Sequence, residues 1–280
     1  MIASQMEVVG VAVPDGACDT HIHFYGPLAK YPPPETPRYE IPDACPEDLF
    51  ALQDAAGISK AVVVNAAVSS PDNRRTFDAL RQYPSRLRGI ITEPVGIPTD
   101  AELEQWDALG VRGVRYSYVG KRVEGFDSRL IARIAELGWH LQIQVEDLQI
   151  LDLDGLVADL PCQLVIDHMG RIPAALGVQS APFQCLLRMA AKGTTWVKLS
   201  APMRCSGERQ LPYADVRDMA QLLMKESPDR MLWGSDWPHV NHAGPIPAYA
   251  ELLRLICEWV PEEGLRRKLL VDNPTVLYGF

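Results

Sequence analysis

Eight short runs rich in β-branched and apolar residues alternate with longer segments along almost the whole 280-residue sequence. The runs are ACDTHIHF (17–24), KAVVVNA (60–66), RGIITEP (88–94), VRGVRYSY (111–118), WHLQIQV (139–145), QLVIDH (163–168), TTWVKLS (194–200) and RMLWGSD (230–236). Such runs are typical of strands in a parallel sheet that is buried on both faces. Eight strand–helix repeats of roughly thirty residues each predict an α/β fold of the (β/α)8 TIM-barrel type, which needs about 250 residues.

An open, doubly wound sheet is the alternative fold, but neither a G-x-G-x-x-G pattern nor a phosphate-binding loop follows the first run. No linker divides the sequence, so we expect a single domain, with residues 1–15 as an N-terminal tail and residues 16–280 as the barrel. A proline-rich segment at about 25–46, YGPLAKYPPPETPRYEIPDACP, follows the first run. It is predicted to form a rigid flap over the mouth of the barrel.

Helix signals lie between the runs. Ser70 followed by Pro71 is typical of an N-cap with proline at the first helical position. Thr99 and Glu102 have the spacing of a capping box. Residues 247–260 carry apolar side chains at helical spacing. These signals predict helices between the strands, as a barrel requires.

The composition narrows the classes of function. A formal net charge of −9 argues against a nucleic acid partner, because phosphate binding needs a basic surface. Arginines in a pocket can still attract a small anion. The apolar runs are much shorter than the roughly 18 residues that span a bilayer, and the first residues lack the pattern of a signal peptide. We therefore expect a cytoplasmic protein with no membrane association, and a homo-oligomer is left open.

Polar residues follow the predicted strands at their C-terminal ends, where catalytic groups of a TIM barrel project. They are His21, His23, Asn65, Glu93, Arg115, Tyr116, Tyr118, Gln144, His168, Ser200 and Asp236, with His239 just beyond. One histidine at a strand end is often structural. Three histidines and one aspartate that converge on one mouth, namely His21, His23, His168 and Asp236, favour an active site.

The sequence is similar to the amidohydrolase superfamily, which has H-x-H on the first strand and an aspartate on the eighth. The blocks DTHIHFYGP, VIDHMGR, WVKLSAP, MLWGSDWPH and VDNPTVLYGF resemble its branch of 2-pyrone-4,6-dicarboxylate lactonases, sulfomuconolactone hydrolases and galactarolactone isomerases. The likeness extends from about Asp19 to Phe280. It implies a hydrolase that opens a small carboxylate-bearing lactone in aromatic or sugar-acid catabolism.

A catalytic zinc needs about three protein ligands and one open position. In metal-using members of this superfamily, a histidine that ends the fifth strand usually completes the ligand set, often with a lysine or glutamate from the fourth strand. The corresponding strand ends here hold Gln144 and Arg115, and a guanidinium group repels a cation. The resemblance also implies a metal-independent lactonase. We therefore expect no cofactor, and a weakly bound zinc held by His21, His23 and Asp236 is left open.

Hydrolysis without a metal needs a base for the attacking water and donors for the carbonyl oxygen. Asp236 is predicted to be the base, and His21, His23 and His168 are predicted to polarise the carbonyl.

Arginines near the strand ends indicate an anionic substrate, because guanidinium groups pair with carboxylates in a bidentate manner. The candidate substrate contacts are Arg115, Arg122, Arg171 and Arg204, with Tyr39 of the flap, Gln144 and Asn65. The resemblance implies that the arginines hold the substrate carboxylates. Gln144 and Ala67 replace a tyrosine and a serine of the pyrone lactonases, which makes a small anionic lactone the expected substrate rather than one particular pyrone.

Three alternatives remain open. A sugar-acid lactone isomerase would use a substrate hydroxyl in place of water. A metal-dependent amidohydrolase or decarboxylase would require an ion. A binding protein on the same scaffold would have no turnover at all.

Overall fold

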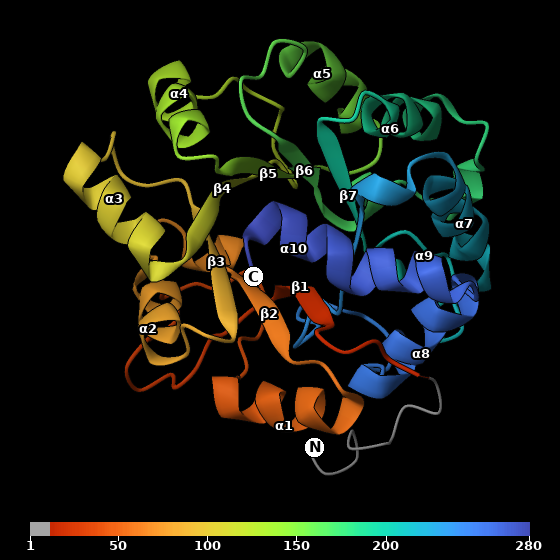
Figure 1. Cartoon of the computed structure of the whole chain (residues 1–280), viewed down its shortest axis with the longest axis horizontal. Coiled ribbons are helices and arrows are strands. Elements are labelled where there is room, and N and C mark those ends of the chain that lie inside the picture. The colour runs from red at the N-terminus through yellow and green to blue at the C-terminus, as the bar shows by residue number, and fades with distance from the viewer. Residues whose placement is uncertain (1–11) are drawn as a thin grey trace.

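Eight parallel strands lie side by side in sequence order around the centre of the molecule (Figure 1). The computed structural model describes residues 12–280, so most of the predicted tail (1–15) lies outside the described residues. The strands are β1 (Cys18–Ile22), β2 (Lys60–Val64), β3 (Leu87–Thr92), β4 (Val111–Ser117), β5 (His140–Gln144), β6 (Leu164–Ile166), β7 (Thr195–Ser200) and β8 (Met231–Gly234). Each lies within or one residue from a predicted run, and the predicted TIM barrel is confirmed.

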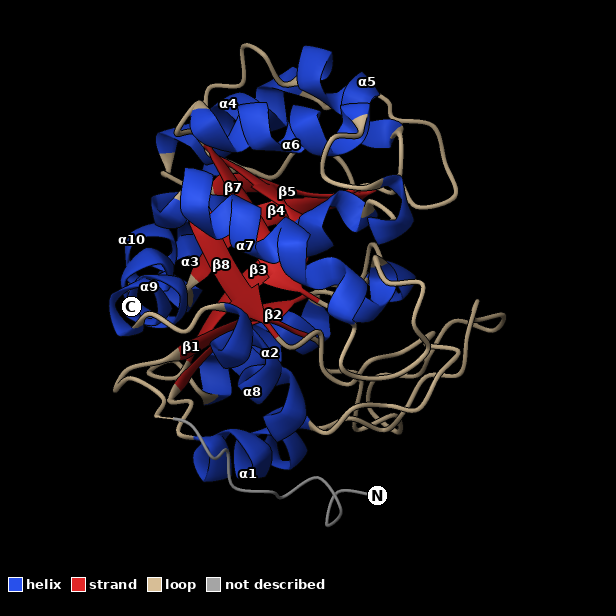
Figure 2. Cartoon of the chain, turned by 90° about the vertical axis from the view of Figure 1, so that its right-hand side faces the viewer, coloured by secondary structure: helices blue, strands red, loops and turns tan. Residues whose placement is uncertain are grey.

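Helices follow the strands and surround the sheet (Figures 1 and 2). They are α1 (Pro46–Ala56), α2 (Arg74–Gln82), α3 (Asp100–Leu109), α4 (Ser128–Glu136), α5 (Gln149–Leu156), α6 (Ala181–Ala191), α7 (Arg217–Glu226), α8 (Tyr249–Trp259), α9 (Glu263–Arg267) and α10 (Asn273–Tyr278). Short 3-10 turns join several of them, and a π-helical turn (Lys268–Asp272) links α9 to α10. None of the helices within residues 12–280 has the length and apolar character needed to span a bilayer.

Backbone contacts between β8 and β1 complete the ring of strands. The Asp236 amide donates to the His21 carbonyl (2.9 Å), and the His23 amide donates to the Trp237 carbonyl (2.9 Å). Gly234 permits this approach, because a Cβ at this position would lie 2.6 Å from the Cβ of His21. Barrel closure therefore places the residues that follow β8 directly beside the two histidines of β1.

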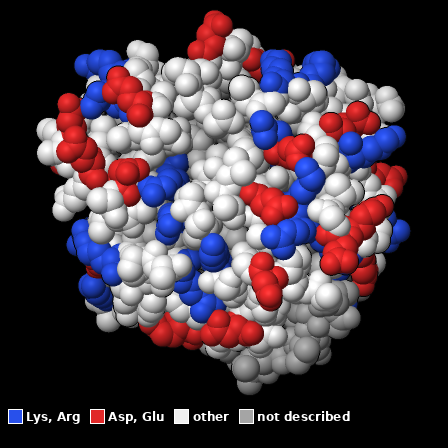
Figure 3. Space-filling model, in the orientation of Figure 1, with Lys and Arg blue, Asp and Glu red and all other residues white. Residues whose placement is uncertain are grey.

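The two ends of the barrel differ. Helix α10 lies across the barrel in Figure 1, and its Tyr278 is fully buried in one cluster with Cys18, the first residue of β1. This helix covers the N-terminal ends of the strands. On this side of the molecule, which Figure 3 shows in the orientation of Figure 1, acidic and basic side chains are interspersed. The long loops gather at the opposite end (Figure 2), where the strand ends are open to a functional site.

The predicted helix signals were correct in two places and wrong in one. Thr99 and Glu102 form the capping box at the start of α3, and α8 lies within the segment 247–260. Ser70 and Pro71 do not open a helix, because α2 begins only at Arg74. The reason is a tertiary contact: the Asn73 side chain exchanges two hydrogen bonds with the backbone of Thr92 at the end of β3 (2.8 and 3.1 Å).

Candidate active site

A cavity of about 320 Å³ opens at the C-terminal ends of the strands. Its walls come from β4 and β5 and from the loops that follow β1, β2, β4, β6, β7 and β8. The predicted flap contributes Tyr25, Pro34, Thr36, Arg38 and Tyr39 to the lining, and no helix or strand forms between β1 and α1. The flap segment therefore borders the cavity.

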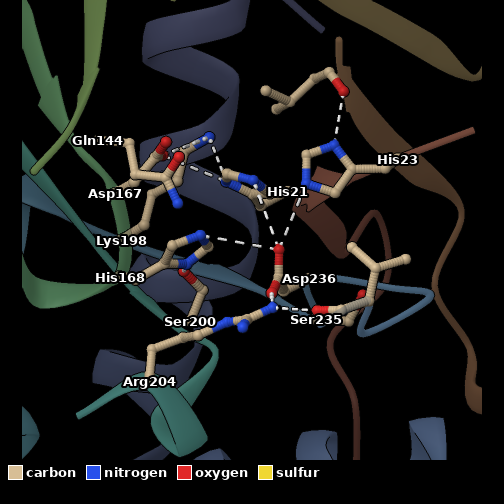
Figure 4. Close-up of polar contacts among 12 residues, drawn as sticks. His21, His23, Gln144, Asp167, His168, Lys198, Ser200, Arg204, Ser235 and Asp236 are labelled. Carbon is tan, nitrogen blue, oxygen red and sulfur yellow. Dashed lines mark hydrogen bonds and ion pairs between the residues drawn. The ribbon is translucent and has the colours of Figure 1, made fainter. Parts of the chain in front are cut away.

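Three imidazole rings surround one carboxylate oxygen at the floor of this cavity (Figure 4). The Nε2 atoms of His21, His23 and His168 lie 3.7, 3.4 and 3.7 Å from Asp236 Oδ1. His23, His168 and Asp236 line the cavity, whereas His21 lies beneath them with no exposed surface. The structure thus brings together all four residues that the sequence predicted as catalytic.

Two of these side chains project from backbone in the left-handed region. His168 has φ 52° and begins a turn that continues through Met169 (φ 51°) and Gly170 (φ 68°), and Asp236 has φ 64°. Such conformations cost of order 1–3 kcal/mol each for residues other than glycine and persist where surrounding contacts hold them. The sharp turns aim both side chains inward at the point where each strand ends.

The second ring nitrogen of each histidine has a different partner. His23 Nδ1 lies 2.7 Å from the Val64 carbonyl oxygen, which can only accept, so this nitrogen carries a hydrogen. His168 Nδ1 lies 2.8 Å from Ser200 Oγ, and a hydroxyl can donate or accept. Neutral His23 therefore turns the lone pair of Nε2 toward Asp236, whereas neutral His168 is free to carry its hydrogen on Nε2.

The buried environment controls protonation in the cluster. Burial lowers the pKa of His168 to about 4, so this ring is neutral near pH 7. Burial alone would raise the pKa of Asp236, but favourable interactions with neighbouring groups, Arg204 Nη2 at 3.3 Å among them, outweigh it and hold that pKa well below its usual range. Asp236 is therefore an ionised carboxylate that faces the cavity.

His21, His23 and Asp236 also have the chemistry of a metal-binding set. Their ligand atoms all lie within 4.8 Å of one another, and His21 Nε2 has no hydrogen-bond partner among the described residues. Nitrogen and carboxylate ligands suit a divalent ion such as zinc. The positive charge of Arg204 would repel a bound metal ion, because its Nη2 lies 3.3 Å from Oδ2 of Asp236. The set fits a divalent ion, with this charge weakening its affinity.

Cations dominate the charged lining of the cavity. Arg115, Arg171 and Arg204, all predicted from the sequence, reach it. Arg38 of the flap and Lys121 of the loop after β4 reach it as well, and the sequence had not singled them out as substrate contacts. Within the described part of the chain, Asp236 is the one acidic residue of the lining. The cavity is therefore electropositive although the chain has a net charge of −9.

Two predicted substrate contacts lie elsewhere. Arg122 is exposed and is not part of the cavity lining, unlike its neighbour Lys121. Asn65 is buried, and its amide donates to the Asp72 carbonyl and to Thr92 Oγ1 (3.1 Å each). Asn65 therefore joins β2 to β3 outside the cavity. Spacing along the sequence could not distinguish these side chains from those that turn inward.

Gln144 and Tyr39 do line the cavity. Gln144 Oε1 accepts a hydrogen bond from Ser117 Oγ (2.9 Å), which leaves the Gln144 amide hydrogens available to a ligand. Burial raises the pKa of Tyr39, so its hydroxyl remains a neutral donor. The cavity therefore presents neutral donors beside its cations.

Sequence reasoning missed two fully buried charges beneath the cluster, Asp167 and Lys198. Asp167 precedes His168 in the block VIDHMGR, and Lys198 lies in the middle of β7. The signal was a lysine within an otherwise apolar run, because a lysine is almost never fully buried without partners.

Histidines at the ends of β1 and β6 and a carboxylate after β8, gathered at the loop end of a TIM barrel, define a hydrolytic enzyme of the amidohydrolase type. Residues 18–280 match the family model described as Amidohydrolase, and the chain belongs to this family.

Similar proteins give the class more detail. A 2-pyrone-4,6-dicarboxylate hydrolase from Comamonas testosteroni is 39% identical over 280 residues, covering 95% of this chain and 91% of that protein. A 4-sulfomuconolactone hydrolase from Rhizobium radiobacter is 38% identical over 278 residues, covering 97% and 92%. These relatives confirm the predicted family and the predicted class of lactone hydrolases.

A solved structure has the same fold. The crystal structure of a probable 2-pyrone-4,6-dicarboxylic acid hydrolase from Acinetobacter baumannii, with citric acid bound, superposes with a TM-score of 0.84. It is 25% identical and covers 95% of this chain and 100% of that chain. The two proteins therefore share the barrel fold over almost their entire lengths.

Proposed function

We propose that this enzyme hydrolyses a small lactone that carries anionic groups. The observation that supports this most directly is the contrast within one cavity: among residues 12–280, a single carboxylate, Asp236, and five Lys or Arg side chains line it. A cavity of about 320 Å³ suits a small molecule. The relatives that act on 2-pyrone-4,6-dicarboxylate and on 4-sulfomuconolactone support the same substrate class.

Asp236 is the base in the proposed reaction. Its carboxylate takes a proton from a water molecule as the water oxygen bonds to the lactone carbonyl carbon. The ring C–O bond then breaks, and the proton on Asp236 passes to the departing oxygen. The product is an open-chain carboxylic acid, and Asp236 returns to its ionised form.

His168 is the proposed donor to the carbonyl oxygen. Its Nδ1 faces the Ser200 hydroxyl, so a neutral ring can present an Nε2 hydrogen to the cavity. Removing one donor of this kind typically costs about 10² to 10³ in kcat. His23 differs, because its neutral form has no Nε2 hydrogen, and it donates there only as an imidazolium.

The proposed reaction needs no metal. Should a divalent ion bind, His21, His23 and Asp236 would hold it, and it would supply polarisation of the ester carbonyl. The residues of the chain would still bind the anionic substrate and exclude bulk water from the cluster.

The arginines orient the proposed substrate. Ion pairs hold these arginines in place. Arg115 pairs with Asp167 (2.9 Å) and Arg204 pairs with Asp236 (3.3 Å), both close to the histidine cluster. Arg171 pairs with Glu146 (3.4 Å). Guanidinium groups at several points of the wall suit a substrate with more than one anionic group.

A panel of carboxylated and sulfonated lactones, with sugar-acid lactones included, tests this proposal. Each compound is followed by NMR in both directions, because ring opening and ring migration give different product spectra. Ring opening of an anionic lactone, with slower turnover of its uncharged ester, is the expected result. Ring migration would identify an isomerase, and tight binding without turnover would identify a binding protein; either result would overturn the proposal.

A further inference from the structure

A compact group of polar side chains lies inside the barrel, directly beneath the histidine cluster. Asp167 and Lys198 have no exposed surface, and Arg115 is 4% exposed. Gln142 of β5 lies among them and is also fully buried. Buried charges of this kind destabilise a protein unless every one is paired and hydrogen-bonded. Here each charge is paired with another, and the pairs lead directly to the histidine cluster.

Asp167 contacts two functional side chains at once. Its Oδ2 accepts a hydrogen bond from Arg115 Nε at 2.9 Å. Its Oδ1 accepts from Gln142 Nε2 at 2.8 Å and lies 3.2 Å from His21 Nδ1. One carboxylate therefore joins an arginine of the cavity wall to a histidine of the cluster.

Lys198 determines which way Gln142 points. The Lys198 ammonium group donates to Gln142 Oε1 (3.0 Å) and to the Thr20 carbonyl (2.8 Å). Since an ammonium group can only donate, the oxygen of Gln142 must face Lys198 and its NH2 group must face Asp167. The orientation of Gln142 thus fixes one lone pair of Asp167 Oδ1.

Asp167 and Lys198 both approach the same atom of His21. Lys198 Nζ lies 3.3 Å from Nδ1, and Asp167 Oδ1 lies 3.2 Å from it. Lys198 already has two closer acceptors, whereas a carboxylate at this distance attracts a hydrogen on the ring nitrogen. The hydrogen therefore belongs on His21 Nδ1, and Nε2 faces Asp236 with its lone pair when the ring is neutral.

We propose that Asp167 is a positioning residue that holds Arg115 and His21 in one arrangement, so that anion binding and catalysis depend on the same buried carboxylate. This inference rests on the proposed lactone hydrolysis for its kinetic consequences. Its structural part, the hydrogen on His21 Nδ1, stands without it.

The structural part is tested on the wild-type protein without any substrate. Long-range proton–nitrogen NMR spectra of protein labelled with 15N-histidine report which ring nitrogens carry hydrogens, and His21→Gln assigns the signals. A hydrogen on Nδ1, with or without a second one on Nε2, is the expected result. A bare Nδ1 would overturn the proposal, because Lys198 rather than Asp167 would then control the ring.

The kinetic part is tested with Asp167→Asn, which keeps the shape and removes the charge. We expect kcat to fall by about 10- to 100-fold, the loss typical when the hydrogen-bond partner of a metal-site histidine is removed, and KM to rise as well. A residue with only a structural role would lower the melting temperature and leave both constants within twofold. That result in a folded variant would overturn the proposal and leave lactone hydrolysis intact.

Asp107→Asn is the matched control. Asp107 Oδ1 also accepts from a ring N–H, Trp139 Nε1 at 2.8 Å, and from an arginine, Arg112 at 3.0 Å, but it does not line the cavity. Unchanged kinetics are expected for this control.

A second variant tests the link to the arginine. The increases in KM caused by Arg115→Lys and by Asp167→Asn are expected not to add in the double variant, since both disturb one contact. Additive effects would contradict the proposed coupling. If Asp167→Asn does not fold, the NMR measurement on the wild-type protein still decides the proposal. If the wild-type protein opens no lactone, only the proposed function fails.

Discussion

The imidazole ring of His23, just after β1, contacts β2 through one ring nitrogen and the residue that follows β8 through the other. Its Nδ1 lies 2.7 Å from the Val64 carbonyl of β2, and its Nε2 lies 3.4 Å from Asp236, which follows β8. The first and last strands of the sequence meet only because the barrel closes. The cluster of His21, His23, His168 and Asp236 is therefore a direct consequence of barrel closure.

Replacement of Asp236 by asparagine should abolish most of the activity. An amide cannot accept the proton of the attacking water, so we expect kcat to fall by at least about 10²-fold while the protein remains folded. Asp229→Asn is a suitable control, because Asp229 is an exposed partner of Lys268 in the turn before β8. Steady-state kinetics measure the turnover of both variants, and circular dichroism shows whether they are folded. If Asp236→Asn turned over substrate at the wild-type rate, Asp236 would not be the base.

Removal of metal ions should leave the proposed reaction intact. Arg204 and the buried Lys198 place positive charge close to His21 and Asp236, which opposes a bound cation. We expect turnover to persist after dialysis against a chelator. Elemental analysis of the active protein accompanies the assay. A stoichiometric ion, with activity that is lost on chelation and restored by zinc, would contradict this prediction.

Arg171 and Arg122 should differ although the sequence suggested the same role for both. Arg171 lines the cavity, and Arg122 is exposed outside its lining. We expect Arg171→Ala to raise KM by about 10-fold with little change in kcat, because a charge-assisted hydrogen bond contributes about 1.5–3 kcal/mol. Arg122→Ala should leave both constants unchanged. Equal effects of the two substitutions would show that the cavity lining does not define the anion site.

Stability should fall as the pH is lowered from about 6.5 to about 4. Burial lowers the pKa of His140 to about 3 and the pKa values of His168 and His239 to about 4, so the unfolded chain binds these protons first. The stability that each neutral ring contributes is present above pH 6.5 and is lost as the pH falls, by up to about 1.4 kcal/mol per pH unit for each histidine.

His140 is the best probe of this effect, because it lies at the start of β5, away from the cavity. Urea unfolding of the wild type and of His140→Leu between pH 4 and pH 7 should show a smaller pH dependence in the variant. Identical slopes for the two proteins would mean that His140 is not buried as a neutral ring.

The repeated apolar runs and the residues at their ends were readable from the sequence, because a buried strand needs a local apolar pattern and its end is marked where that pattern stops. His21, His23, His168 and Asp236 were identified in this way as candidate site residues, and the predicted family is confirmed. The capping box of Thr99 and Glu102 was also readable, since all its atoms lie within one helical turn. Ser70 and Pro71 failed as a helix start because a distant strand residue, Thr92, holds Asn73.

Only the tertiary structure decided which side chains share the cavity and which hydrogens they present. Lys121 turns inward and Arg122 outward, although they are adjacent in a loop whose direction the barrel sets. Asp167, which directly follows β6, and Lys198 of β7 meet beneath His21 of β1, so no spacing along the chain could reveal the contact. Local patterns report what each segment buries, but a reactive site depends on distances between segments, and those distances exist only once the barrel has closed.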